Sequence, residues 1–308
     1  MELSAVIGMS LVMAVWLGTV NIWLGTFLAM ATAYHVWPVY NSAGYTSIHN
    51  LILAAGLILF IKYAEKDIEN KLLDMMVAVS CFNLLTILIA EAGIQIPYQV
   101  WWGQDCEGIM ANRNESAALF AFTAFAGFRP KRWWFLAVVA LGLILTRTSG
   151  VVFGLGFALM FYFKRLFDNK KLFFVYLGII AGLILYIYFV DVPGIRERGL
   201  MWTGTAWAIL QRPLGWGLGR WPLIYNHSPH NEFLRAMFEM GILAGIVIIG
   251  YAVSLFMSYR GRMTKENSII LCSLITTAFI SGIGFQLHIG ATGLIACLWI
   301  GLAERRRV

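Results

Sequence analysis

A series of apolar runs, most of them long enough to cross a membrane, limits the possible folds of this chain more than any other feature. They include Asn50 to Tyr63, Met75 to Ala92, Leu172 to Val190, Glu239 to Met257 and Ser268 to Gly284. A helix needs about 20 apolar residues to span the hydrocarbon core. Only 13% of the residues are charged, about half the usual share in a water-soluble domain. The sequence therefore predicts an all-α fold, a polytopic bundle of transmembrane helices.

Clusters of basic residues between the apolar runs predict how the helices are oriented. The five clusters are Lys62/Lys66/Lys71, Arg129/Lys131/Arg132, Lys164/Arg165/Lys170/Lys171, Arg260/Arg262/Lys265 and Arg305/Arg306/Arg307. Because lysine and arginine in short loops resist translocation, all five are expected on the cytoplasmic side. The chain must then cross out and back between consecutive clusters. This places residues 38–48, 93–112, 146–150, 191–229 and 285–290 on the outer side.

The number of spans depends on two stretches of the sequence. Leu3 to Trp37 can form one helix or two short ones, and Trp133 to Phe163 is predicted to be a hairpin broken near Arg147. The bundle then has about 10 to 11 transmembrane helices, with Leu3 to Trp16 in the first of them. We expect residues 1–308 to form a single transmembrane domain, in which an extracytoplasmic helical loop at 191–229 carries part of the functional site. The four cysteines are dispersed, so no disulfide framework, metal site or cofactor is predicted.

The basic residues outside the five clusters are all arginines. They are Arg113, Arg147, Arg196, Arg198, Arg212, Arg220 and Arg235. The guanidinium fork matches the oxygen geometry of phosphate, which favours an oxyanion site on the outer side. Alternatively, such arginines anchor to lipid headgroups or pair with nearby acids. Arg235 fits ion pairing best, because Glu232 and Glu239 lie three and four residues away on one predicted helix.

Arg147 is the least easily explained of these arginines. Both predicted arms beside it are short, so the residue is expected to lie below the outer membrane surface. A charge placed there costs about 2.5 to 3.5 kcal/mol unless it faces a polar cavity. This cost favours a functional role.

The stretch from Arg198 to Gly219 combines a predicted helix with a glycine-rich segment. Residues 198–210 are typical of an amphipathic helix at the membrane interface, with Arg198 and Trp202 one turn apart on a shared face. The helix should end at Arg212, because a residue before proline is pushed out of helical geometry. The glycines at 215, 217 and 219 do not follow a strand, which argues against a dinucleotide-binding loop. They are expected to allow close backbone approach to a ligand or a neighbouring helix.

The segment Ser228-Pro229-His230-Asn231 has the composition of a helix start. Serine is a favoured cap and proline a favoured first helical residue, so His230 is predicted in the first turn of the following span. Free backbone N–H groups at such a position attract phosphate oxygens and favour a neutral imidazole. A neutral imidazole can act as a general base. The alternative is that His230 only bonds to a neighbouring loop.

Several short motifs, taken together and in order, resemble the O-antigen ligase and O-antigen polymerase superfamily. They are Asn112-Arg-Asn114-Glu-Ser-Ala, Thr146-Arg147-Thr148-Ser149, Arg198-x-x-x-Trp202, Pro213-Leu-Gly215-x-Gly217, His230-Asn231-Glu-Phe-Leu and Glu239-x-Gly241. The resemblance implies a GT-C-like fold and an inverting, metal-independent glycosyltransferase of the bacterial inner membrane, with its site on the periplasmic side. The donor would be a glycan on undecaprenyl diphosphate. The acceptor would be a hydroxyl of lipid A core, of another glycan or of a protein.

The resemblance also implies roles for individual residues. Arg147 and Arg198 would hold the diphosphate leaving group, and His230 would activate the acceptor hydroxyl. Further substrate contacts are expected from a larger set, namely Arg196, Arg220, Trp202, Asn112, Arg113, Asn114 and Asn231.

Other classes of membrane protein remain as alternatives. A transporter or flippase for an anionic or lipid-diphosphate substrate would usually show two related halves with interrupted helices. No halves match here, and the charges gather on one side. An intramembrane protease is disfavoured because the chain lacks His-Glu-x-x-His and paired aspartates. A purely structural subunit would leave Arg147 unexplained, and nucleic acid is not an expected partner.

Overall fold

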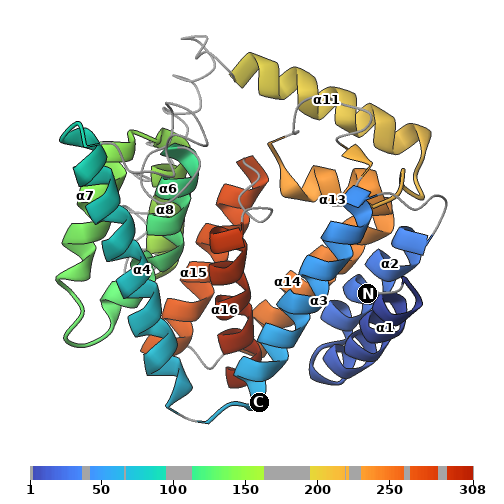
Figure 1. Cartoon of the computed structure of the whole chain (residues 1–308), viewed down its shortest axis with the longest axis horizontal. Helices are drawn as coiled ribbons and strands as arrows, with labels where there is room; N and C mark the ends of the chain where they lie inside the picture. Colours follow the sequence, from blue (N-terminus) through green and yellow to red (C-terminus); the bar gives the residue numbers. More distant parts are fainter. Residues whose placement is uncertain are drawn as a thin grey trace. The chain divides into compact units, whose positions relative to one another are not determined.

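The computed structural model describes residues 3–36, 42–65, 67–94, 113–162, 195–218, 220–221, 230–259, 264–283 and 290–307. Every regular element in these ranges is a helix, which confirms the all-α prediction for this part of the chain (Figure 1). Three of these helices are long and apolar enough to cross a membrane: α4 (Ile68–Glu91), α14 (Ile242–Tyr259) and α15 (Lys265–Ile283). Shorter apolar helical stretches are Met9–Val20, Ile22–Ala33, Asn50–Tyr63, Phe135–Thr146 and Gly150–Leu159.

The chain forms two compact units. Unit 1 comprises Met1–Gly56 and Met160–Met257, and unit 2 comprises Leu57–Leu159 and Ser258–Val308. The single domain expected from the sequence stays a prediction.

Unit 1 begins with a pair of helices, α1 (Leu3–Val20) and α2 (Ile22–Val36), which pack side by side (Figure 1). Asn21 separates them, and its Oδ1 accepts a hydrogen bond from the backbone N of Trp23 at 3.0 Å. Gly18 and Gly25 allow the close approach, because a Cβ on Gly25 would lie 2.5 Å from the Cα of Gly18. Of the two possibilities for Leu3 to Trp37, the structure therefore has two short helices.

The remaining described part of unit 1 holds most of α3 (Ser42–Tyr63), together with α11 (Ile195–Gln211), α13 (Glu232–Met240) and most of α14. The ring of Trp23 on α2 fills the space beside Gly250 on α14, where a Cβ would meet the ring at 2.6 Å. In Figure 1, α13 lies beside α11, with which it is in contact.

Unit 2 is built around α6 (Arg113–Thr123) and the 3₁₀ turn η1 (Ala124–Phe128). All side chains from Glu115 to Ala126 are buried. Helices α4, α7 (Phe135–Thr146), α15 and α16 (Gly290–Arg306) contact α6. The Phe120 ring fills the space beside Gly142 on α7, and the indole N–H of Trp299 on α16 donates to the carbonyl of Phe122 at 2.7 Å.

The break predicted near Arg147, in the stretch from Trp133 to Phe163, is confirmed. Helix α7 ends at Thr146, and α8 (Ser149–Tyr162) begins after Arg147 and Thr148. Helix α8 packs on α15, where Gly154 leaves room for Phe279 and Ile280.

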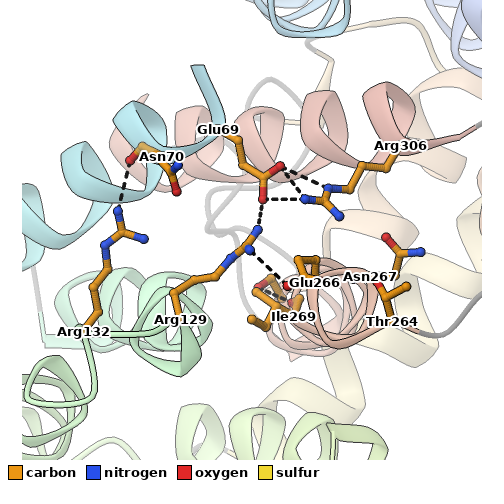
Figure 2. Close-up of polar contacts among 10 residues, drawn as sticks. Glu69, Asn70, Arg129, Arg132, Thr264, Glu266, Asn267, Ile269 and Arg306 are labelled. Atoms are coloured by element: carbon orange, nitrogen blue, oxygen red, sulfur yellow. Dashed lines mark hydrogen bonds and ion pairs between the residues drawn. The ribbon is translucent and has the colours of Figure 1, made fainter. Parts of the chain in front are cut away.

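Several of the basic clusters meet at one end of unit 2. Figure 2 shows the carboxylate of Glu69, at the start of α4, bound by Arg129 and Arg306. Arg129 also lies 3.5 Å from Glu266 at the start of α15. Arg305 donates to the carbonyls of Ile61 and Ala64 at the end of α3, at 3.0 and 2.6 Å. Within unit 2, clusters expected on one side of the membrane therefore share one end.

Candidate functional site

Arg147 occupies an unusual backbone conformation at the end of α7. Its φ of 51° and ψ of 34° are left-handed, and its N–H donates to the carbonyl of Leu143 at 3.2 Å. Glycine is the usual residue at such a helix end, because a Cβ disfavours this conformation. The side chain of Arg147 is exposed. Arg147 therefore lies in the break between α7 and α8, in a backbone conformation that costs an arginine some energy.

A hydrogen bond joins the motif segment that contains Arg147 to the motif segment at the start of α6. The hydroxyl of Thr148 donates to Oδ1 of Asn114 at 3.4 Å, and it also lies 3.1 Å from the carbonyl of Thr146. Arg113 and Asn114 are the first residues of α6, and both are exposed. The segments around residues 113 and 147 therefore lie together. Asn112 lies outside the described residues.

In unit 1, α11 carries Arg198 and Trp202 on the face that packs against α13. Arg198, Trp202, Thr205 and Ile209 are spaced by four, three and four residues, which places them in one stripe along the helix. Thr205 and Ile209 are buried, and Ile209 packs in a cluster with Phe238 of α13. The shared face predicted for Arg198 and Trp202 is confirmed, and both side chains are half-buried. Arg196 also lies in α11, but its side chain is outside the described part.

Helix α11 ends at Gln211, as the Arg212-Pro213 pair predicts. The glycine segment that follows runs against the end of α13. The backbone N–H groups of Trp216 and Gly217 donate to the carbonyls of Phe238 and Glu239, each at 2.9 Å. Gly215 and Gly217 have φ of 91° and 104°. The glycines thus allow close approach to a neighbouring helix, one of the two roles predicted for them.

Replacing Gly215 by alanine is expected to lower the free energy of unfolding by about 3 kcal/mol or more. A Cβ would lie 2.5 Å from the backbone N of Gly241 and 2.6 Å from the carbonyl of Glu239, and neither atom can rotate away. The thermal unfolding midpoint of the purified protein measures this loss. Gly204→Ala is the matched control, because Gly204 is helical and has open space around it, so alanine should raise stability by about 0.5 to 1 kcal/mol. Equal midpoints for the two variants would contradict the close packing.

Aromatic rings fill the space between the glycine segment and α13. The rings of Trp216 and Phe238 stack with centroids 5.7 Å apart, and Trp221 meets Phe238 edge-on at 4.7 Å. The guanidinium of Arg212 lies 5.4 Å from the ring centre of Trp216. Arg220 precedes Trp221 and is half-buried, with its N–H donating to the carbonyl of Gly217 at 3.2 Å. The aromatic cluster therefore fixes the backbone position from which the Arg220 side chain extends.

The helix after His230 begins later than the sequence predicts. Asn231 is the cap of α13, and its Oδ1 accepts from the N–H of Leu234 at 3.0 Å. The prediction that His230 lies in the first turn of a span is therefore wrong. His230 precedes the cap with a left-handed φ of 48°. Ser228 and Pro229 lie outside the described residues.

Helix α13, which starts at Glu232, is also separate from the span predicted after His230. Helix α13 has 9 residues and ends at Met240. Gly241 then adopts a φ of 79°, and α14 begins at Ile242. The run from Glu239 to Met257 is therefore interrupted, because the glycine segment at 213–217 occupies the space beside this turn: the N–H of Ile242 donates to the carbonyl of Pro213 at 2.9 Å.

Arg235 makes the ion pair expected for it. Its Nε lies 3.3 Å from Oε1 of Glu239, one turn along α13, and the Glu239 side chain is buried. This arginine is therefore engaged within its own helix. Sequence reasoning missed the hydrogen bond from Thr148 to Asn114 and the cap formed by Asn231. For Asn231 there was a signal, because asparagine is a favoured cap residue.

The described site residues thus form two groups. Arg113, Asn114 and Arg147 lie at one end of unit 2, whereas Arg198, Trp202, Arg220, His230 and Asn231 belong to unit 1. That Arg147, Arg198 and His230 act on one substrate, as the resemblance implies, stays a prediction.

The described structure defines the class as an all-helical protein with helices that can span a membrane. No model of a known protein family matches the chain, and no curated protein is significantly similar to it.

Proposed function

We propose that this protein is a membrane glycosyltransferase that moves a glycan from undecaprenyl diphosphate to an acceptor hydroxyl. The transfer is inverting and metal-independent, and the acceptor is another glycan, lipid A core or a protein. The protein is a GT-C-like bundle of about 10 to 11 helices in the bacterial inner membrane, with the site facing the periplasm. The proposal rests on the ordered motifs from Asn112 to Gly241 and on their resemblance to the O-antigen ligase and polymerase superfamily.

One structural observation carries the proposal. The described non-glycine residues with positive φ are Lys131, Arg147 and His230, and two of these three are residues to which the motifs assign catalysis. Left-handed backbone is uncommon for residues with a side chain and is enriched at functional sites. The backbone geometry thus supports the roles that the motifs suggest for Arg147 and His230.

The proposed chemistry needs a base and a set of cations. His230 takes the proton of the acceptor hydroxyl, and the acceptor oxygen attacks the anomeric carbon from the face opposite the phosphate. The carbon–oxygen bond to the diphosphate breaks, and its electron pair stays on the leaving phosphate oxygen. Arg147 and Arg198 stabilise that developing charge, as preorganised donors do in a site that excludes water.

Purified full-length protein, incubated with a synthetic polyprenyl diphosphate glycan, tests the function directly. Candidate acceptors are a second lipid-linked glycan, lipid A core and a protein, and mass spectrometry identifies the product. A new glycosidic bond with inverted configuration supports the proposal. Counterflow of the labelled lipid into vesicles without any new bond would instead indicate a transporter or flippase.

Replacing His230 by glycine is expected to lower the rate of transfer by about 10² to 10⁴. Glycine keeps the left-handed backbone without strain, so the loss reports the imidazole alone. The acid limb of the pH–rate profile should also disappear, because that limb reflects protonation of the base. Initial rates measured across pH provide both readouts.

Lys131→Gly is the matched control for this change. Lys131 has a φ of 66° and lies outside the proposed site, so glycine there releases similar backbone strain without removing a catalytic group. Its transfer rate should equal that of the unaltered protein. An unchanged rate and pH profile for His230→Gly would exclude the base role.

A further inference from the structure

An ion pair links α4 to the turn before α7, at the end of unit 2 where the basic clusters meet. Nε of Arg132 donates to Oδ1 of Asp74 at 2.8 Å, and Nη2 lies 2.6 Å from the same oxygen. Figure 2 shows Arg132 reaching from this turn to Asn70, whose carbonyl accepts from Nη2 at 3.4 Å. The Asp74 side chain is 65% exposed. An ion pair this exposed adds little to stability, but it presents two opposite charges to the surroundings of the helices.

Both residues of the pair stand where a helix becomes apolar. No charged residue follows Asp74 until Glu91, and none follows Arg132 until Arg147. Helix α4 is long and apolar enough to cross a membrane. Directly after Arg132 comes Trp133, which is 75% exposed and of a residue type enriched at membrane–water interfaces. With α4 across the membrane, the pair therefore lies at the level of the lipid headgroups.

Exposed apolar side chains continue from the pair along both helices. Phe82 and Leu85 on α4 are more than half exposed, and their spacing places them on the same face as Asp74. On α7, Leu141 and Ile144 are exposed in the same way. Helices α4 and α7 contact each other. From Asp74 to Leu85 the helix rises about 16 Å, close to the depth of about 15 Å of one leaflet of the hydrocarbon core.

We propose that Asp74, Arg132 and Trp133 bind the headgroup of phosphatidylethanolamine, a zwitterionic membrane phospholipid whose acyl chains lie along α4 and α7. The lipid ammonium contacts Oδ2 of Asp74, because Arg132 occupies Oδ1. The lipid phosphate contacts Nη1 of Arg132 and the indole N–H of Trp133, since the described contacts of the guanidinium use Nε and Nη2. One carboxylate and one guanidinium thus complement one ammonium and one phosphate. The lipid site is independent of the proposed glycosyl transfer.

The same geometry selects against two other common phospholipids. Phosphatidylcholine carries the same two charges, but its trimethylated ammonium has no N–H to donate to Asp74. Phosphatidylglycerol has the phosphate and lacks the cation, which leaves the Asp74 carboxylate without a partner in the headgroup. Both lipids are therefore matched probes for the role of the carboxylate.

Thermal unfolding of the full-length protein in a neutral detergent, titrated with phospholipids of identical acyl chains, tests the site. Phosphatidylethanolamine should raise the midpoint in a saturable way, because a ligand that binds only the folded state stabilises it. Its half-saturating concentration should be about fivefold lower than that of phosphatidylcholine or phosphatidylglycerol, as expected for one charged contact at an exposed site. Soluble glycerophosphoethanolamine has no chains to lie along the helices and should leave the midpoint unchanged.

Variants assign the preference to individual side chains, each read against its own lipid-free midpoint. Asp74→Asn should abolish the preference for phosphatidylethanolamine over phosphatidylcholine. Arg132→Gln should weaken the binding of all three lipids, since each has a phosphate. Asp67→Asn is the matched control, because it removes a carboxylate from another exposed ion pair, with Lys71 at 3.0 Å, at the start of the same helix. The lipid preference of this control should equal that of the unaltered protein.

Native mass spectrometry of the unaltered protein, released from an equimolar mixture of the three lipids, gives a second readout that does not depend on how the variants fold. Preferential retention of phosphatidylethanolamine supports the site. Equal retention of phosphatidylethanolamine and phosphatidylcholine would overturn it, and so would preferential retention of phosphatidylglycerol. A preference that persists in Asp74→Asn, or saturation by the soluble headgroup at the same concentration as the lipid, would also overturn it.

Discussion

Replacing Arg147 by glycine is expected to lower the rate of glycan transfer by about 10² to 10³ while leaving the protein folded. The left-handed φ of 51° at this position suits glycine better than arginine, so the backbone of the break between α7 and α8 should persist. The side chain is exposed, and its removal opens no cavity. Loss of rate would then report a missing interaction with the diphosphate. Initial rates at saturating acceptor, with the thermal midpoint as a check on folding, measure the effect.

Two further variants separate charge, geometry and backbone. Arg147→Lys keeps the positive charge but loses the bidentate fork, so its rate should fall between those of the unaltered protein and Arg147→Gly. Lys131→Gly relaxes another left-handed residue of unit 2 and should leave the rate unchanged. A normal rate for Arg147→Gly would remove Arg147 from the mechanism.

Coupling between Arg147 and Arg198 tests whether the two groups of residues act on one diphosphate. Arg198→Ala alone should cost a similar factor, whereas Arg212→Ala, an exposed arginine beside Trp216, should cost little. Residues that act as a unit show losses that do not multiply. The double variant should therefore lose much less than the product of the two single losses. If the double variant loses rate by the full product of the two single losses, the two guanidinium groups act at separate sites.

Local features of this fold were predictable from the sequence because their causes are local. Pro213 ends α11 by steric conflict with the residue before it. The break at Arg147 follows because the apolar stretch from Trp133 to Phe163 is too long for one span and carries a charge near its middle. The pair between Arg235 and Glu239 follows from helical spacing alone. Each of these depends on residues within a few positions of one another.

The sequence failed where two local signals competed and where a feature depends on distant partners. The start of α13 was placed too early because Pro229 is a strong first-turn signal, whereas Asn231 is the residue that caps the helix. The break at Gly241 exists because the segment around Gly215 packs against it, and no local pattern indicates that contact. The burial of Glu115 likewise follows from four helices surrounding α6. From hydropathy alone, a carboxylate at the start of a helix is expected to face water.

Replacing Glu69 by glutamine is expected to lower the free energy of unfolding by about 3 kcal/mol, which corresponds to a fall of about 6 to 12 °C in the unfolding midpoint. The Glu69 carboxylate accepts hydrogen bonds from Arg306 at 2.7 and 3.1 Å and also binds Arg129 (Figure 2). The side chains of Glu69 and Arg129 are each 13% exposed, so solvent screens them little. Without the carboxylate, the guanidinium groups of Arg129 and Arg306 repel each other, and Glu266 still offsets the charge of Arg129. Burial, followed by the nearby Arg306, already lowers the pKa of Arg129.

The control for Glu69 lies in the turn before it. Asp67 and Lys71 form an ion pair of 3.0 Å in which both side chains are more than half exposed (61% and 66%). Asp67→Asn removes the same charge but should change stability by no more than about 0.5 kcal/mol. Glu69→Gln combined with Arg306→Gln should be less harmful than the sum of the two single changes, because the second removes an uncompensated charge. If Glu69→Gln behaves like Asp67→Asn, the carboxylate does not hold the ends of α4, α15 and α16 together.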